Sequence, residues 1–379
     1  MRLNKQKGKL VLLRGAGSVA AILLICCFVV RVIPFARAES ANAALLSARL
    51  VLPGESESAA DAASSLPEDS DSAFEEKAES AILPDPEAQL GEPAASESET
   101  SSADSQPETQ PDPEKGKTYP IIETVVGGGT QYGNLFIKTD SGMELPDFTE
   151  ELASDPDVSV AVDGSPTVLL YHTHTSEAYM ESDSTFYYES MKSRSDDPSR
   201  TVVAVGDAIA KALEEAGIGV IHDTTVHDTT YTGSYARSEQ TVREYMEKYP
   251  GIEITIDIHR DGLETADQEK MKPTVEIDGN KAAQIMIMSG CDADGSLNFS
   301  DWKYNLRFAL QIQNRMTARY GELMRPLYFC DRNYNMHLSH GSILVEFGTD
   351  ANAVSEAVYS GTLFGKGLAE EILALADES

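Results

Sequence analysis

The sequence predicts an α/β domain with a mostly parallel central sheet and helices on both faces, preceded by a membrane helix and a disordered linker. Three observations support this prediction. Strand and helix patterns alternate from Pro166 onward, an apolar run follows a basic N-terminus, and an acidic segment separates the two parts. The chain has 379 residues, which is enough for one or two globular domains.

The N-terminus has the features of an exported chain. Basic residues come first, and an uncharged apolar stretch then runs from Gly15 to Val30 and resumes after one arginine. The whole run is close to the ~20 residues of a membrane helix. For residues 1–38 we therefore predict a cytoplasmic basic tip and a single transmembrane anchor, with the rest of the chain outside the cytoplasm. The Ala-Arg-Ala segment at 36–38 resembles a cleavage site, so a signal peptide is the alternative.

Residues 39–118 form the predicted linker. Between Val51 and Thr118, 18 acidic residues stand against three basic ones. High net charge with few apolar residues is typical of disorder, because burial cannot offset the backbone entropy lost on ordering. The segment is either a self-repelling spacer between the membrane and the folded part, or a solvated stretch with no function of its own.

Composition excludes several classes of function. Asp and Glu outnumber Lys and Arg by 62 to 30, which gives a net charge of -32 and argues against a nucleic-acid partner. The four cysteines form no CxxC motif, which argues against a thiolate zinc site or a redox motif. Cys291 and Cys330 are either bridged to each other or two buried free thiols.

Residues 119–379 form the predicted folded domain. Residues 120–147 are expected to form short strands with glycine turns ahead of the main sheet. Continuous apolar runs, typical of strands buried on both faces, then predict the strands. These are residues 167–173, 219–225, 253–259, 281–290 and 342–348.

The helices are predicted from apolar residues at helical spacing. In the first of them, Val205, Ile209 and Leu213 share one face, and Gly217 stops the helix. The four predicted helices are residues 202–217, 234–249, 301–320 and 353–375.

Polar residues accompany three of the predicted strands. His174 and Glu177 follow the first, His259 ends the central one, and Glu346 lies within the last. Parallel strands bring such residues to one edge of a sheet. Two imidazoles and a carboxylate match an open zinc site, and a further carboxylate could act as general base and then acid.

Spacing alone leaves several roles open. His172 shares the strand face of His174, so either could be the ligand. Glu177 could instead cap a helix, and Asp257 could either orient His259 or pair with an arginine. The histidines in or near connections are expected to be structural: His222, His227, His337 and His340. No nucleophile elbow, Walker loop or dinucleotide-binding fingerprint accompanies a strand.

Three segments resemble the stage II sporulation protein P family: YHTHTSEAY at 171–179, TIDIHRDG at 255–262 and LSHGSILVEFGTDAN at 338–352. The resemblance covers the chain from about Tyr119 onward. It implies a fold related to the zinc-dependent N-acetylmuramoyl-L-alanine amidases, which cleave the amide between muramic acid and the L-alanine of the peptidoglycan stem peptide. It also implies endopeptidase action on cross-links, and work with the stage II sporulation proteins D and M at the septal membrane during forespore engulfment.

The resemblance also assigns roles to individual residues. The T-H-x-x-E pattern selects His174 over His172 and includes Glu177 as the third zinc ligand, and the second segment supplies His259. The third segment supplies Glu346 as the catalytic carboxylate. In the related amidases the carboxylate ligand comes later, before a helix, but residues 193–203 contain no Glu here.

Two other functions fit the same residues. The chain could be a non-catalytic, wall-binding scaffold that recruits septal partners, in which case the histidines are structural. It could also be a polysaccharide deacetylase with a different zinc arrangement. Zinc content and the products released from peptidoglycan distinguish these functions.

Overall fold

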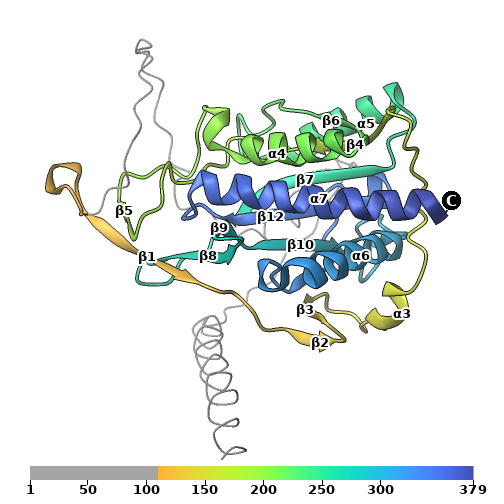
Figure 1. The fold of residues 1–379 in the computed structure, drawn as a ribbon, viewed down its shortest axis with the longest axis horizontal. Coiled ribbons are helices and arrows are strands. Elements are labelled where there is room, and N and C mark those ends of the chain that lie inside the picture. Colours follow the sequence, from red (N-terminus) through yellow and green to blue (C-terminus); the bar gives the residue numbers. More distant parts are fainter. Residues whose placement is uncertain (1–109, 379) are drawn as a thin grey trace, which may run out of the picture. The chain divides into compact units, whose positions relative to one another are not determined.

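The computed structural model describes residues 110–378, which contain two β-sheets and the helices packed on them (Figure 1). The large sheet has eight strands in the order β2-β3-β11-β10-β12-β7-β4-β6, and the small sheet has the order β5-β1-β8-β9. The predicted membrane helix and residues 39–109 of the predicted linker lie outside the described residues. Within residues 110–378, no helix combines the length and the apolar character that crossing a bilayer requires.

The elements of the large sheet are β2 (Thr130–Tyr132), β3 (Leu135–Asp140), β4 (Pro166–Tyr171), β6 (Gly219–His222), β7 (Ile254–Asp261), β10 (Ile285–Gly290), β11 (Leu327–Cys330) and β12 (Gly341–Thr349). The small sheet consists of β1 (Thr118–Thr124), β5 (Phe186–Tyr188), β8 (Lys270–Ile277) and β9 (Asn280–Ala283). The α-helices are α3 (Phe148–Leu152), α4 (Val202–Glu215), α5 (Ser234–Lys248), α6 (Trp302–Tyr320) and α7 (Val354–Glu378).

The prediction of a mostly parallel sheet is wrong, because both sheets are mixed. β6, β4, β7 and β12 are parallel neighbours, but β10 runs antiparallel to β12 and β2 antiparallel to β3. The cause is a hairpin that the sequence analysis missed. β8 and β9 are joined by Asp278 and Gly279, both with positive φ, so the chain reverses there without a helical crossover. β10 follows β9 directly and therefore enters the large sheet antiparallel to β12.

Helices cover both faces of the large sheet (Figure 1). In β4, Val168 and Leu170 belong to the main hydrophobic core, which includes residues of α4, α6 and α7. The alternate residues, Leu169 and Tyr171, pack with Val242 of α5 on the opposite face. This alternation explains why β4 is apolar along its whole length, as a strand buried on both faces must be.

The seam between α4 and α7 depends on two glycines of α7. A Cβ atom at Gly361 would lie 2.9 Å from Val205 Cγ1, and one at Gly365 would lie 2.8 Å from Ala212 Cβ. Both distances are shorter than normal carbon contacts. The two helices therefore pack with their backbones in close approach, and α7 directly follows the strand that carries Glu346.

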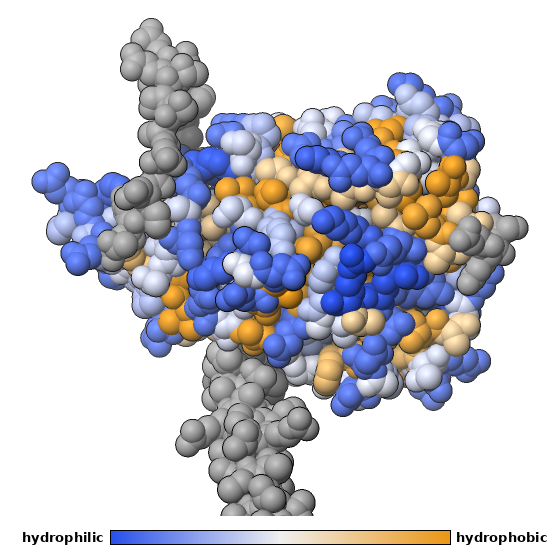
Figure 2. Space-filling view, in the orientation of Figure 1, coloured by the Kyte–Doolittle hydropathy of each residue, from blue (hydrophilic) through white to orange (hydrophobic). Residues whose placement is uncertain are grey.

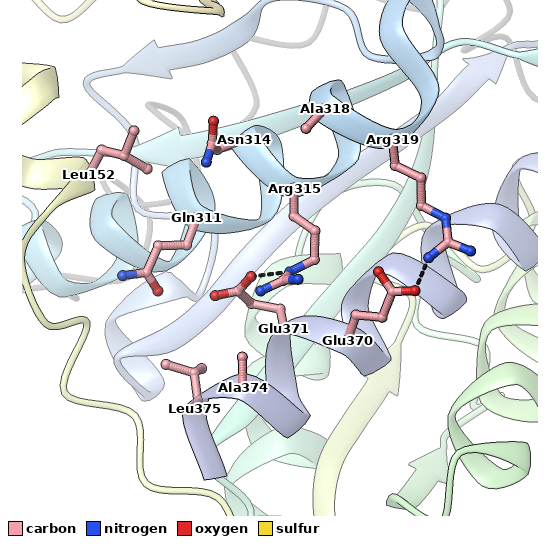
Figure 3. Close-up of a pocket in the computed structure, with 10 residues that line it drawn as sticks. All are labelled: Leu152, Gln311, Asn314, Arg315, Ala318, Arg319, Glu370, Glu371, Ala374 and Leu375. Carbon is pink, nitrogen blue, oxygen red and sulfur yellow. Dashed lines mark hydrogen bonds and ion pairs between the residues drawn. The ribbon is translucent and has the colours of Figure 1, made fainter. Parts of the chain in front are cut away.

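A groove of about 680 Å³ lies between α6 and α7 (Figure 3). Ion pairs of Arg315 with Glu371 and of Arg319 with Glu370 cross it. Figure 2 shows hydrophilic side chains gathered over these two helices, in agreement with the ion pairs. None of the predicted site residues lines this groove, so we interpret the pairs as links between the helices.

Cys291 and Cys330 are both buried free thiols, which decides between the two alternatives given by the sequence. Cys330 ends β11 and Cys291 directly follows its parallel neighbour β10, and Cys291 Sγ lies 3.3 Å from the carbonyl oxygen of Cys330. Burial raises the pKa of Cys291 to about 12, so this thiol is uncharged and a poor nucleophile at neutral pH.

Candidate active site

β7 and β12 carry two of the predicted site residues side by side. The two strands are parallel, and their register pairs His259 with Glu346. The apolar residues of β7 point into the main core, so Asp257 and His259, which alternate with them, point to the opposite face. β12 is interrupted just after Glu346 by a register shift at Gly348, whose φ of 66° is rare for other residues. The sheet thus places an imidazole and a carboxylate next to each other.

His174 and Glu177 lie in the turn that follows β4. The backbone N–H of Glu177 donates to the carbonyl of His174 at 3.1 Å, which closes the turn. The backbone N–H of Val202, at the start of α4, donates to the carbonyl of Glu177 at 3.0 Å. Since β4 is parallel to β7, the turn emerges at the same edge of the sheet as His259.

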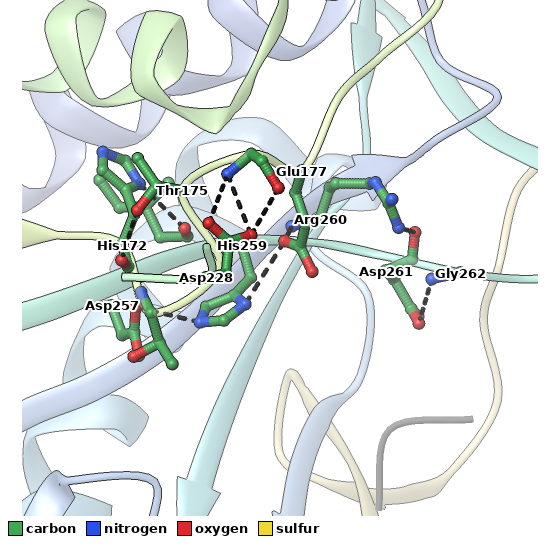
Figure 4. A network of polar contacts seen from close by, with 12 residues as sticks. His172, Thr175, Glu177, Asp228, Asp257, His259, Arg260, Asp261 and Gly262 are labelled. Atoms are coloured by element: carbon green, nitrogen blue, oxygen red, sulfur yellow. Dashed lines mark hydrogen bonds and ion pairs between the residues drawn. The ribbon is translucent and has the colours of Figure 1, made fainter. Parts of the chain in front are cut away.

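The structure brings these residues together, and Figure 4 shows Glu177, Asp257 and His259 in one network of polar contacts. The rings of His174 and His259 lie 5.4 Å apart, centroid to centroid, and nearly perpendicular. His259 lies between two carboxylates, with its Nδ1 3.4 Å from Glu177 Oε2 and its Nε2 3.0 Å from Asp257 Oδ1. Asp257 in turn accepts bonds from the backbone N–H and the hydroxyl of Thr173, at 2.8 and 2.6 Å. Asp257 is thereby fixed against one nitrogen of His259, and the other nitrogen faces Glu177.

His174 is completely buried, and neither of its ring nitrogens has a hydrogen-bond partner among residues 110–378. The same holds for one carboxylate oxygen of Glu346, Oε2. Buried polar atoms without partners are costly, and they usually mark a missing ligand or a catalytic role. Nε2 of His259 also makes no hydrogen bond within these residues, although it lies 3.0 Å from Asp257 Oδ1 as an ion-pair contact. His174, His259 and Glu346 are therefore the side chains of this site with unused bonding capacity.

The donor types fit a zinc ion. Imidazole nitrogens and a carboxylate are ordinary zinc ligands, and His174 has ring nitrogens available for one. As the side chains stand, no group of three His, Cys, Asp or Glu residues between 110 and 378 is arranged as a metal site. In this arrangement Glu177 contacts Nδ1 of His259 directly, and Asp257 lies against the other ring nitrogen, Nε2.

Electrostatics divide the four groups into two kinds. Burial alone would lower the pKa of His259, but Asp257 and Glu177 outweigh it and raise that pKa well above its usual value. Burial would raise the pKa of Glu177, but His259 and Arg260 outweigh it and lower that pKa. Both groups are therefore charged in the metal-free protein, and a metal ion that binds His259 must displace a proton from its ring.

The other two groups are neutral near pH 7. Burial lowers the pKa of His174 to about 4. Burial, followed by the charge of Asp261, raises the pKa of Glu346 to about 8. An imidazole without its proton is the form that can bind a metal ion, and a carboxyl with a pKa near neutrality can both give and take a proton.

His172 does not join this group. One of its nitrogens, Nδ1, lies 3.1 Å from the carbonyl oxygen of Ile258, and Nε2 lies 2.8 Å from Nε2 of His222. His222 contacts Asp207 with its other nitrogen, at 3.0 Å. All four ring nitrogens of the pair are used, so His172 is a structural residue.

The remaining histidines within residues 110–378 are also held by ordinary contacts. His227 contacts the carbonyl of His172 and the hydroxyl of Thr241. His337 contacts the side chain of Asn333, and His340 contacts Asp157. These positions agree with the structural roles expected from the sequence.

The residues that cover His174 were not predicted from the sequence. The ring of Tyr231 stacks on His174 at 4.8 Å, almost parallel, and the guanidinium of Arg194 lies 5.4 Å from the centre of the Tyr231 ring. Arg194 also donates to Ser176 Oγ at 3.0 Å and pairs with Asp228. These residues come from polar connections with no periodic pattern, so local sequence carries no signal for them.

Comparisons with known proteins agree with the sequence motifs. The model of the stage II sporulation protein P family matches residues 48–369. Among curated proteins, stage II sporulation protein P of Bacillus subtilis (strain 168) is 27% identical over 206 residues, which are 50% of this chain and 47% of that protein. The match thus spans about half the length of this relative.

Among solved structures, the apo N-acetylmuramyl-L-alanine amidase Ami1 of Mycobacterium abscessus matches with a TM-score of 0.33 and 14% identity, over 56% of this chain and 99% of that one. The CwlD amidase of Clostridioides difficile, solved in complex with the GerS lipoprotein, matches with a TM-score of 0.33 and 11% identity, over 55% of this chain and 99% of that one. The family model extends over far more than half of the sequence, and the chain therefore belongs to the stage II sporulation protein P family.

Proposed function

We propose that the chain is a zinc-dependent peptidoglycan hydrolase of sporulation that acts as an N-acetylmuramoyl-L-alanine amidase, with endopeptidase activity as an additional capacity. The observation that carries the proposal is the buried, unpartnered imidazole of His174 beside His259, Glu177 and Glu346. Family membership supports the sporulation context.

In this proposal His174, His259 and Glu177 hold the zinc ion. Nε2 of His259 faces Asp257 at 3.0 Å, so Nδ1, which faces Glu177, is the nitrogen assigned to the metal. Zinc, when bound, lowers the pKa of a water molecule and polarises the scissile carbonyl. Asp257 is then a positioning residue, because it fixes the ring orientation and the tautomer of His259.

Glu346 is the general base and acid of the proposed reaction. Its carboxylate takes a proton from the attacking water and returns it to the nitrogen of the leaving amine. Its position next to His259 in the register of β7 and β12 supports this role, as does its raised pKa, since a carboxyl near neutrality can act in both directions.

The proposal includes the setting of the reaction. The N-terminal run is a single membrane anchor, the hydrolase domain lies outside the cytoplasm at the septal or forespore membrane, and the protein works there with the stage II sporulation proteins D and M during engulfment. The substrate is peptidoglycan, whose glycan and stem peptide meet at the amide to be cleaved.

Two measurements on the full-length protein test the proposal. We expect about one zinc ion per chain by elemental analysis, and release of stem peptides with a new N-terminal L-alanine from purified peptidoglycan, detected by mass spectrometry of the products. Release of acetate without peptides would indicate a deacetylase. A protein with neither zinc nor products would be a scaffold, and the proposal would then be wrong.

A further inference from the structure

A second concave surface adjoins the candidate active site. This groove, of about 1080 Å³, runs from the turn that carries Glu177 to β5 and the loop that follows it. Ser176, Arg194 and Asp228 line its inner end, and Figure 4 shows Asp228 close to Glu177. Ser176 directly precedes the buried Glu177, so the groove lies one residue away from a proposed zinc ligand.

The lining of the groove suits a short peptide. Apolar and aromatic side chains such as Met180, Met191 and Phe186 alternate with the hydroxyl groups of serines. Apolar walls with a few polar groups are typical of ligand sites, and both kinds of group match the side chains and amides of a peptide. A volume of this size, at the upper end of the ~300–1,000 Å³ of ordinary ligand pockets, has room for a peptide of a few residues.

The charges of the groove are mostly paired internally. Arg194 pairs with Asp228, and Arg200 pairs with Glu181 at 2.8 Å. Lys192 and Asp196 also line the groove, are exposed, and form no ion pair within residues 110–378. Lys192 is the cation of the groove without an ion pair among these residues, and an ammonium group of this kind attracts a carboxylate at close range.

We propose that this groove binds the stem peptide of peptidoglycan and that Lys192 pairs with a free carboxylate of that peptide. The inference rests on the proposed function for the identity of the ligand. It adds the surface that selects the substrate and the residue that distinguishes a free carboxylate from an amidated one.

The test measures binding separately from cleavage. The probes are N-acetylmuramoyl-L-alanyl-D-glutamic acid and its isoglutamine form, which differ only in a carboxylate and a carboxamide. Titration calorimetry uses the full-length Glu346→Gln protein, or the parent protein with a chelator if that variant does not fold. We expect the acid to bind about threefold to tenfold more tightly than the amide, and less so at high salt, as expected for a partly exposed ion pair.

Substitution of Lys192 is the decisive step. Lys192→Glu should remove the preference for the acid and leave binding of the amide within about twofold. The matched control is Lys211→Glu on α4, which reverses a highly exposed lysine outside the groove and should change neither affinity. Equal preference in the parent and in Lys192→Glu would overturn the role of Lys192, and equal binding of N-acetylmuramic acid without a peptide would overturn the peptide groove.

The outcome does not depend on hydrolysis. If the protein cleaves no peptidoglycan but binds the acid in a Lys192-dependent manner, the groove assignment stands and the proposed function fails. If the protein cleaves the amide bond but binds the acid without dependence on Lys192, the proposed function stands and the groove assignment fails.

Discussion

Two histidine pairs lie at the same edge of the large sheet and have opposite surroundings. His172 and His222 contact each other at 2.8 Å and use their other nitrogens on a backbone carbonyl and a carboxylate. His174 lies only two residues further along and has no partner for either nitrogen among residues 110–378. Its neighbour His259 lies between two carboxylates.

The difference shows what separates a structural histidine from a candidate ligand. Both His172 and His174 are fully buried, so burial does not distinguish them. Burial, with the nearby His222, lowers the pKa of His172 to about 3, so that ring is also neutral. What differs is the use of the nitrogen lone pairs. The first pair is satisfied within the protein, and the second has capacity for a ligand.

Removal of His174 should have the largest effect. His174→Ala in the full-length protein should abolish both zinc binding and peptide release, because the substitution removes an imidazole ligand. Elemental analysis and product mass spectrometry measure the two losses. His172→Ala is the matched comparison and should keep its zinc, and a result in which both variants lose zinc equally would erase the distinction between the pairs.

Substitution of Glu346 should separate metal binding from catalysis. Glu346→Gln should keep the zinc content and lower the rate of amide cleavage by about 10²- to 10⁴-fold, the usual contribution of a general base. The control is Glu276→Gln, an exposed glutamate of β8, which should cleave at the parent rate. Cleavage by Glu346→Gln at the parent rate would show that another group takes the proton.

Loss of the structural pair should appear in stability. His172→Ala should lower the free energy of unfolding by about 3 kcal/mol, because it leaves a cavity and removes the partner of the buried His222 ring. Urea unfolding followed by circular dichroism measures this change. His340→Ala, at a partly exposed contact with Asp157, should cost less than about 1 kcal/mol. Equal costs would mean that the pair contributes nothing beyond a surface contact.

Asp257→Asn should weaken zinc binding by about tenfold without abolishing it. The amide keeps the shape of the side chain but cannot supply the negative charge that fixes the tautomer of His259. Competition with a chromophoric chelator measures the affinity. An unchanged affinity would show that the contact between Asp257 and His259 is incidental to the metal.

The smallest effect concerns pH and the metal-free protein. Because the folded-state pKa of Glu346 is raised to about 8, the folded state binds its proton more tightly than the unfolded state does. Glu346 therefore contributes stability at low pH that declines as pH rises from about 4.5 to about 8. Chelator-treated parent protein should lose stability over this range more steeply than Glu346→Gln, as urea midpoints would show. If the stabilities of the parent and of Glu346→Gln declined in parallel with pH, the raised pKa of Glu346 would be contradicted.

The sequence was sufficient to predict which strand ends converge. The runs before His174 and His259 and around Glu346 have the length and composition of buried strands, and β4, β7 and β12 are parallel neighbours. The sequence was not sufficient for the pairing of β8, β9 and β10, because strand direction depends on a two-residue turn and not on apolar periodicity. It also could not separate His172 from His174, since that difference depends on His222, 50 positions away.

The close seam between α4 and α7 limits how this domain can diverge. Positions 361 and 365 admit no side-chain atom without a shift of one helix against the other, and α7 continues from the strand that presents Glu346. Among relatives that keep this helix pair, we expect these two sites to stay glycine even where the surrounding helical surface changes freely. A substitution there would be tolerated only together with a compensating loss of volume on α4, at Val205 or Ala212.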